Sequence, residues 1–172
     1  MRLGKRRLID FLEEVGEELN HNITLVAVGG TAMTLLGLKP STIDVDFTGP
    51  SDDISAFKHA MKNVAHGFTV HCYPDGLVFS QILPNNYISK SVTIKSRFKH
   101  IELRALHPVD IVVTKIGRLD SRDKQDIEAC IKKGGLRRAE IARRAKYVQH
   151  VGREENYRTN LDHVLRNFFE SS

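Results

Sequence analysis

The chain has only two cysteines, and it has no apolar run long enough to cross a bilayer. Its two cysteines, Cys72 and Cys130, stand far apart without the spacing of a zinc site, so we expect structural thiols. No histidine lies at metal-ligand spacing from a second one. We therefore expect neither a membrane partner nor a zinc-type centre.

The composition is that of an ordinary folded protein. Hydrophobic residues make up 41% and charged residues 27% of the 172 positions, and there is no repeat, low-complexity tract or clear linker. An acidic amphipathic stretch follows the basic residues 1–7, where a signal peptide would carry its apolar core. We expect a cytoplasmic protein with one core and room for a small helical appendage.

The charge balance is positive, with a formal net charge of +5 and an isoelectric point near 9.3. Such an excess favours a polyanionic partner, such as RNA or nucleotide phosphates. The sequence carries no aromatic-rich RNA-binding signature, which argues against a plain RNA-binding module.

Hydrophobic periodicity divides the chain into helices and strands. Helical spacing predicts helices over residues 8–19, 31–38, 51–64, 108–119, 124–133, 137 onward and 160–169. Short apolar or alternating runs predict strands over residues 23–28, 42–47, 68–73, 77–83, 91–98 and 101–106. The economical arrangement is an α/β (α+β) fold, a mixed sheet flanked by helices. We expect a main domain over residues 1–133 and a helical C-terminal extension over residues 134–172 packed on it.

Two carboxylates, Asp44 and Asp46, stand two residues apart on the predicted strand 42–47. Residues spaced in this way project from one face, roughly 6.5–7 Å apart along the strand, and they repel each other unless a cation lies between them. Mg²⁺ prefers hard oxygen ligands and often takes one or two carboxylates together with substrate phosphates. Val45 and Phe47 point to the opposite, buried face. A solvated strand end explains an isolated pair of this kind equally well.

Gly29 and Gly30 lie between the predicted strand 23–28 and the next helix, which Thr31 would cap. Glycines at such a junction let backbone N–H groups approach a phosphate closely, and the helix N-terminus adds positive potential. A tight turn that needs a positive φ explains a glycine pair on its own. Taken together, the two motifs place a phosphate-binding turn beside a carboxylate pair, with thirteen residues between Gly30 and Asp44.

This arrangement resembles the nucleotidyltransferase superfamily with the DNA polymerase β-like fold. Its signature is an apolar residue, Gly, then Gly or Ser, a short helix, and Asp-apolar-Asp/Glu-apolar. In this chain the matching residues are Val28-Gly29-Gly30 and Asp44-Val45-Asp46-Phe47.

The later chain resembles a subgroup of small prokaryotic members. That subgroup is related to the nucleotidyltransferase-like toxins of abortive-infection, type IV toxin–antitoxin systems. The residues that carry this likeness are 83–87, the stretch from Pro108 to Lys115, Arg118, Asp123 and Asp126. With the first two motifs, the likeness spans roughly residues 23–133.

The resemblance implies an enzyme that moves a nucleotidyl group from a nucleoside triphosphate to a hydroxyl acceptor on RNA or protein, in a toxin-like component with a cognate antitoxin-like partner. In the superfamily, carboxylates hold metal ions, Mg²⁺ or Mn²⁺, that bridge the nucleotide phosphates and activate the acceptor hydroxyl. The residues so implied are Asp44 and Asp46 for catalysis and metal binding, and Gly29, Gly30, Thr31 and Lys115 for nucleotide binding.

A third carboxylate is not evident in the sequence. We expect Glu102, on the predicted strand 101–106, to be the further metal ligand, and Asp75 is the second candidate. A surface Glu102 paired with Arg104 or Lys99 explains the same pattern. Without a third acid, the alternative is a catalytically degenerate member that acts as a nucleotide- or partner-binding module.

Lys115 falls on the predicted helix 108–119, where it would reach the triphosphate or else extend to solvent. Asp123 and Asp126 would orient Lys115 or Arg118 by ion pairing, or simply complement the start of a helix.

The basic run from Lys132 to Lys146 is either a solvated helix face or a docking face for RNA, such as tRNA, or an acidic partner. A dinucleotide-binding domain is set aside, because Thr31 and Thr34 stand where glycines are expected after Gly29.

Overall fold

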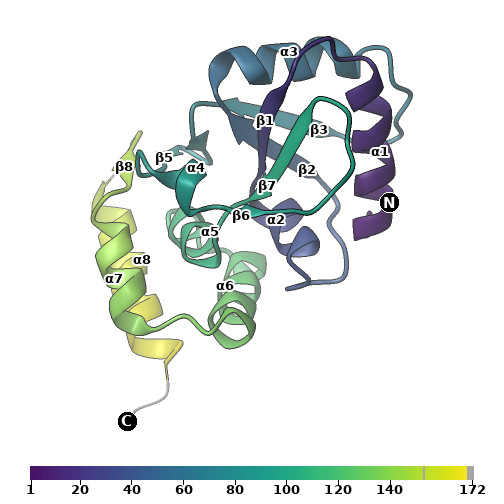
Figure 1. Cartoon of the computed structure of the whole chain (residues 1–172). Coiled ribbons are helices and arrows are strands. Elements are labelled where there is room, and N and C mark those ends of the chain that lie inside the picture. The colour runs from purple at the N-terminus through teal and green to yellow at the C-terminus, as the bar shows by residue number, and fades with distance from the viewer. Residues whose placement is uncertain (153, 170–172) are drawn as a thin grey trace.

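A five-stranded mixed sheet forms the centre of the molecule in the computed structural model, which describes residues 1–152 and 154–169 (Figure 1). The strand order is β3 (Val70–Pro74), β2 (Val45–Gly49), β1 (Ile23–Ala27), β7 (Ile101–Ala105) and β6 (Val92–Thr93). Strand β1 runs antiparallel to β2 and parallel to β7, while β2 runs parallel to β3. The predicted α/β (α+β) class with a mixed sheet is confirmed.

A second, smaller sheet joins distant parts of the chain. It is antiparallel, and its strands are β4 (Leu77–Val78), β5 (Gln81–Ile82) and β8 (Gln149–His150). The first two form a hairpin after β3, and β8 arrives from the C-terminal helices. This sheet therefore ties the C-terminal part of the chain to the edge of the main sheet at β3.

Helices α1 (Lys5–Glu17) and α3 (Ser51–Met61) pack together on one face of the main sheet (Figure 1). The ring of Phe57 meets Phe11 edge-on at 6.5 Å between centroids and Phe47 of β2 at 5.4 Å. Each such buried aromatic contributes about 1.5–3 kcal/mol by its removal from water. The predicted burial of Val45 and Phe47 on this face is confirmed.

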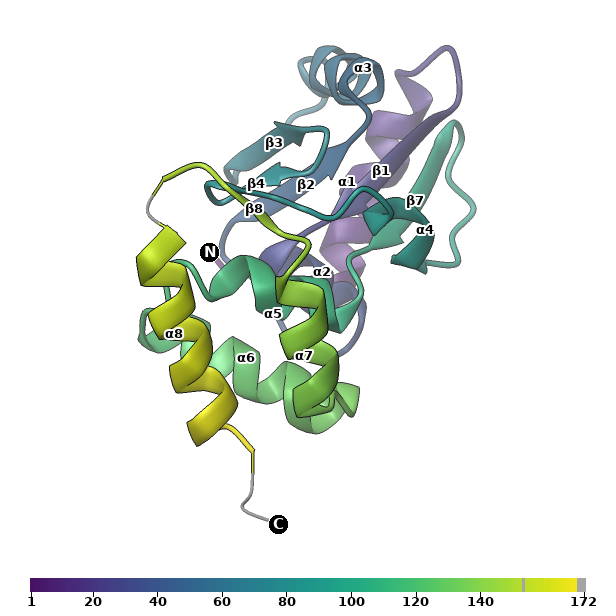
Figure 2. The ribbon, with the colours of Figure 1, turned by 90° about the vertical axis from the view of Figure 1, so that its left-hand side faces the viewer.

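Four further helices lie away from α1 and α3, as the two views show (Figures 1 and 2). They are α5 (Pro108–Lys115), α6 (Ser121–Gly134), α7 (Arg138–Ala145) and α8 (Glu154–Asn167). The short helix α2 (Gly29–Leu35) contacts the main sheet and α5, and the single turn α4 (Tyr87–Lys90) precedes β6. Helix α8 is fixed to α5 by the hydroxyl of Tyr157, which donates to the carbonyl of Val113 at 2.8 Å. The division at residues 133 and 134 stays a prediction.

The helix after the glycines begins earlier than the sequence indicated. Gly29 and Gly30 form its first turn, Val28 is the N-cap, and the helix ends at Leu35. Thr31 is therefore not the cap; its hydroxyl bonds to Asp44, in the segment before β2, and to Asp46 of β2. That segment is a bend, so β2 begins at Val45 and not at residue 42.

The predicted strand 77–83 is a hairpin with Phe79 and Ser80 at its turn, where φ is 50° and 65°. A two-residue hairpin of this kind favours Asn-Gly or Asp-Gly, and neither is present there, so no turn was predicted within this segment. The predicted strand 91–98 shrinks to Val92–Thr93, and the last helix begins at Glu154, six residues before its predicted start.

Both cysteines are free thiols. Burial raises the pKa of Cys72 to about 11 and that of Cys130 to about 12, so both stay protonated at neutral pH. Within residues 1–152 and 154–169, no helix combines the length and apolar character needed to span a membrane.

An ion pair between Arg144 and Asp110 fastens α7 to α5. Arg144 donates from Nε to Asp110 Oδ1 at 2.6 Å and from Nη2 to Oδ2 at 2.8 Å, and a third bond goes to Asn86. Asp110 is fully buried. One member of the basic run thus belongs to the interior of the molecule.

Replacement of Arg144 by Met should lower the free energy of unfolding by about 3–5 kcal/mol, because it leaves the buried Asp110 carboxylate without its partner. Urea denaturation measures this loss. Arg143→Met, at the exposed neighbouring position, is the matched control and should change stability by less than about 0.5 kcal/mol. The double variant Asp110→Leu/Arg144→Met should recover most of the loss. A wild-type denaturation midpoint for Arg144→Met would contradict the assignment.

Candidate active site

A cleft of about 410 Å³ runs between the ends of β2 and β3 and the helices α5 and α6. The loop before β2 supplies its rim. Acidic and basic groups line it together: Asp44, Asp46, Asp123 and Asp126 with Arg2, Lys39, Lys115, Arg118 and Arg122. The cleft thus brings together both predicted carboxylates, Gly30 and Lys115.

Asp46 lies on β2 and is 7% exposed. His71 stands in register with it on the parallel strand β3, and His71 Nδ1 lies 3.1 Å from Asp46 Oδ1. Burial raises the pKa of the Asp46 carboxyl; the bond to His71 opposes this shift, and the nearby charge of Asp44 adds to it. A charge held at this position is therefore costly until a cation approaches.

Asp44 occupies a different environment, since it precedes the strand and is exposed. Its carbonyl oxygen accepts hydrogen bonds from Thr42 Oγ1 at 2.8 Å and from Thr31 Oγ1 at 3.3 Å. These two hydroxyls fix the backbone of the bend, so that the Asp44 carboxylate faces the same cleft as Asp46.

Thr31 joins the glycine turn to the carboxylate pair. Its side chain is fully buried, and its Oγ1 accepts from the backbone N–H of Asp46 at 2.9 Å while it donates to Asp44. The hydroxyl is thus used within the protein, behind the cleft.

The two glycines differ in backbone conformation and surroundings. Gly29 has a φ of +53°, the left-handed conformation that glycine adopts most easily. Gly30 lines the cleft, and a Cβ at this position would lie 2.7 Å from Thr42 Oγ1. A Cβ on Gly29 would lie 3.2 Å from the Phe79 ring and 4.0 Å from Asp46 Oδ2, so both glycines stand beside the predicted carboxylates.

Lys115 is 5% exposed and does not extend to solvent. Its Nζ lies 3.0 Å from Asp126 Oδ2 and 3.3 Å from Asp123 Oδ1, and Lys39 also pairs with Asp126, at 3.2 Å. Arg118 donates to both oxygens of Asp123, at 2.7 and 2.8 Å.

These ion pairs shift the pKa values of Arg118 and Asp123 so that both groups stay charged. The bonds to Asp123 raise the pKa of Arg118. Burial alone would raise the pKa of Asp123, but the bonds and charges of Arg118 and Lys115 lower it below its ordinary value. Asp123 and Asp126 thus have the expected ion-pairing role, and Asp123 also has the alternative one, since it completes the capping box at the start of α6 by accepting from the backbone N–H of Asp120.

The structure does not bring Glu102 to the cleft. Its side chain is 56% exposed and pairs with Arg104 at 2.9 Å. Glu102 pairs in register with Thr24, near the start of β1. Asp46 lies at the other end of β1, where its carbonyl accepts from the backbone N–H of Val28. Thr24 and Val28 are four residues apart, about 13 Å along the strand. Across residues 1–152 and 154–169, no group of three or more His, Cys, Asp or Glu side chains is arranged to hold a metal ion.

The sequence did not point to His71 and Tyr73, which β3 presents beside Asp46. They alternate on one face of the strand, and only the parallel pairing of β2 with β3 reveals where that face lies. Burial, followed by the charge of Asp46, raises the pKa of Tyr73 to about 12. Asp75 is committed elsewhere, because it accepts from the backbone and hydroxyl of Ser51 at the start of α3.

Comparison with known proteins places these features in one family. A family model described as "Nucleotidyltransferase of unknown function (DUF6036)" matches residues 6–161, nearly the whole chain. This range includes the glycine turn, Asp44, Asp46 and the cations Lys115 and Arg118. Searches of curated proteins and of solved structures found no match. The chain therefore belongs to the DUF6036 family of nucleotidyltransferases.

Proposed function

We propose that the protein transfers a nucleotidyl group from a nucleoside triphosphate to a hydroxyl acceptor, with Mg²⁺ or Mn²⁺ held at Asp44 and Asp46. One observation carries this proposal: the carboxylate pair and Gly30 share a cleft with the cationic groups of Lys39, Lys115 and Arg118. Membership of the family supports nucleotidyl transfer as the reaction class.

The two carboxylates suit a metal ion that binds together with the phosphates of the nucleotide. Two carboxylates supply hard oxygen ligands, which is fewer than an all-protein cage requires but typical of Mg²⁺ sites completed by phosphates. A bound ion would neutralise phosphate charge and lower the pKa of the acceptor hydroxyl. The raised pKa of Asp46 agrees with this reading, because a carboxylate that is costly to ionise alone gains most from a cation.

The chain's own groups would bind and orient the triphosphate. Lys115 and Arg118 are held in place by Asp123, so their cationic groups need little ordering when a phosphate approaches. Gly30 lets the backbone come close to a phosphate oxygen. His71 occupies Oδ1 of Asp46, which fixes the rotamer of that carboxylate.

The acceptor in this proposal is a hydroxyl on RNA or protein. Arg137, Arg143 and Lys146 of the basic run are exposed and would serve an RNA such as tRNA, whereas Arg144 is held by Asp110. A toxin-like role with an antitoxin-like partner rests on the sequence resemblance alone. Two of the residues that carry this resemblance, Asn86 and Asp110, accept hydrogen bonds from Arg144, so a structural role explains them.

A catalytically inactive nucleotide- or partner-binding module is the second candidate. The observation that favours it is that the described residues bring no third carboxylate to Asp44 and Asp46. The two candidates differ in one readout, the metal-dependent transfer of labelled nucleotide to an acceptor.

Substitution of Asp44 or Asp46 by Asn should abolish Mg²⁺-dependent nucleotide binding and reduce transfer by at least about a hundredfold, since metal stabilisation of the transition state amounts to several kcal/mol. Titration calorimetry with each nucleoside triphosphate, with and without Mg²⁺, measures binding, and labelled nucleotide measures transfer. Asp10→Asn, on the exposed side of α1, is the matched control. Full transfer by the double variant Asp44→Asn/Asp46→Asn would disprove the assignment. Binding without transfer to any acceptor would favour the second candidate.

The difference in stability between the Asp46→Asn variant and wild type should depend on pH in a defined direction. A carboxyl whose pKa is raised by folding costs stability as the pH rises from the unfolded value, about 3.9, through the folded one. In metal-free buffer, Asp46→Asn should therefore melt at a higher temperature than wild type at pH 7, and the difference should shrink toward pH 4. Thermal melts between pH 4 and pH 8 test this, with Asp10→Asn again as control. A variant that is less stable than wild type at pH 7 would refute it.

Gly30→Ala should weaken nucleotide binding by about tenfold or more, because small misplacements of site groups are costly. The added methyl group displaces the Thr42 hydroxyl, which holds the Asp44 carbonyl. Gly67→Ala is the control, since its Cβ would meet only the end of Met1, at 3.6 Å. Equal affinity of Gly30→Ala and wild type in calorimetry would show that the turn does not contact the nucleotide.

A further inference from the structure

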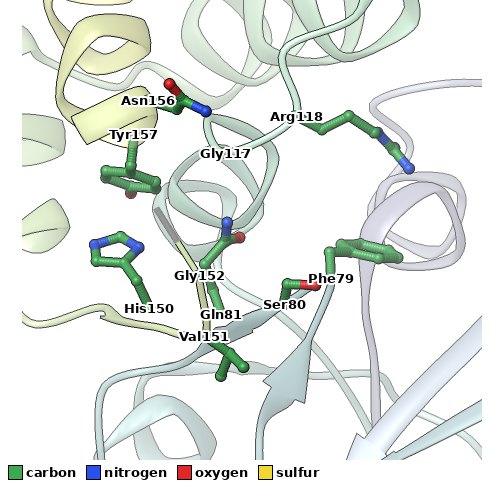
Figure 3. Close-up of a pocket in the computed structure, with 10 residues that line it drawn as sticks. All are labelled: Phe79, Ser80, Gln81, Gly117, Arg118, His150, Val151, Gly152, Asn156 and Tyr157. Carbon is green, nitrogen blue, oxygen red and sulfur yellow. The ribbon is translucent and has the colours of Figure 1, made fainter. Parts of the chain in front are cut away.

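A second cavity, of about 440 Å³, adjoins the cleft, and the side chains of Phe79 and Arg118 line both. The β4–β5 hairpin, β8, the segment after α5 and the start of α8 line it. Figure 3 shows the amide of Gln81 in this cavity, between His150 and Tyr157 on one side and Phe79 and Arg118 on the other. Apart from the two shared residues, the proposed transfer reaction uses none of its lining.

Gln81 carries an unfilled hydrogen-bonding position. The residue is 6% exposed, and its Oε1 is a buried acceptor with no partner within residues 1–152 and 154–169. Buried polar atoms in folded proteins nearly always have a partner, since an unpaired one costs free energy. The missing partner must be a donor, an N–H or O–H group.

The position of this amide is built into the fold. Gln81 pairs through its backbone with Val78 and His150 in the small sheet. Its side chain fits against Gly117, where a Cβ would lie only 1.9 Å from Nε2, so only glycine leaves room for it. The amide is therefore held at one place beside the cavity.

Aromatic groups stand on two sides of the amide. The rings of His150 and Tyr157 lie 4.3 Å apart between centroids, and the guanidinium of Arg118 lies 5.5 Å from the centre of the Phe79 ring. Nucleobases stack on such surfaces, and a Gln amide, with an acceptor next to a donor, matches the edge of a base.

We propose that this cavity receives the nucleobase of the triphosphate and that Gln81 Oε1 accepts a hydrogen bond from an N–H group of the base. The inference rests on the proposed function, which puts the phosphates in the neighbouring cleft. Phe79 stands at the junction, since its ring lies 3.2 Å from where a Cβ of Gly29 would be and edge-on to Tyr73 at 5.8 Å between centroids. The nucleoside triphosphate would therefore lie across the ring of Phe79, with its phosphates toward Asp44 and its base toward Gln81.

The test compares Gln81→Met with wild type by calorimetry in Mg²⁺, using the four nucleoside triphosphates, their 2′-deoxy forms and inorganic tripolyphosphate. Gln81→Met should bind at least one nucleoside triphosphate about tenfold or more weakly, in its ribo and deoxy forms alike, and should bind tripolyphosphate as wild type does. The unliganded variant should melt no lower than wild type, because Met keeps the unbranched shape and removes the unpaired acceptor. Gln149→Met, at an exposed position of β8, is the matched control.

The outcomes separate the two proposals. Unchanged nucleotide affinity in Gln81→Met, with tripolyphosphate bound by wild type, would overturn the base assignment and leave the proposed function standing. A loss confined to the ribonucleotides would assign Gln81 to the ribose hydroxyl, which also overturns it. If wild type binds neither nucleotide nor tripolyphosphate, both proposals fail.

Discussion

One buried hydroxyl, that of Thr31, connects the parts of the site. It accepts from the backbone N–H of Asp46 and donates to the carbonyl of Asp44, so the turn after β1 and the bend before β2 cannot move independently. Because unpaired backbone groups in the interior are costly, this contact fixes where the chain returns after α2. The distance between Gly30 and the carboxylates follows from it.

Around this fixed point, the fold brings charges of opposite sign into one cleft. Asp46 is buried on β2, and Lys115 is buried on α5 with Asp123 and Asp126 as partners. Burying an ionised group costs free energy, and for Lys115 the ion pairs with Asp123 and Asp126 limit this cost. For Asp46 the compensation is less complete, as the raised pKa of its carboxyl indicates. In the proposed function, the metal ion would supply the positive charge that compensates Asp46.

The parts of the site that follow one another closely in sequence were predictable. The Gly29-Gly30 turn, Asp44 and Asp46 could be recognised from spacing, because strand and helix periods fix local geometry. His71 could not, since its place beside Asp46 depends on the pairing of β2 with β3. Glu102 was expected near the pair, but the register of β7 on β1 puts it at the other end of the sheet. The orphan acceptor of Gln81 depends on β5, β8 and Gly117 meeting, which no local pattern encodes.

The most direct test of the account is a crystal structure with Mn²⁺ and a non-hydrolysable nucleoside triphosphate, with anomalous scattering used to locate the metal. The proposed metal site predicts a manganese peak between the carboxylates of Asp44 and Asp46, with the phosphates beside Gly30 and Lys115. A metal–nucleotide complex bound elsewhere on the protein, with the Asp44–Asp46 cleft empty, would contradict it.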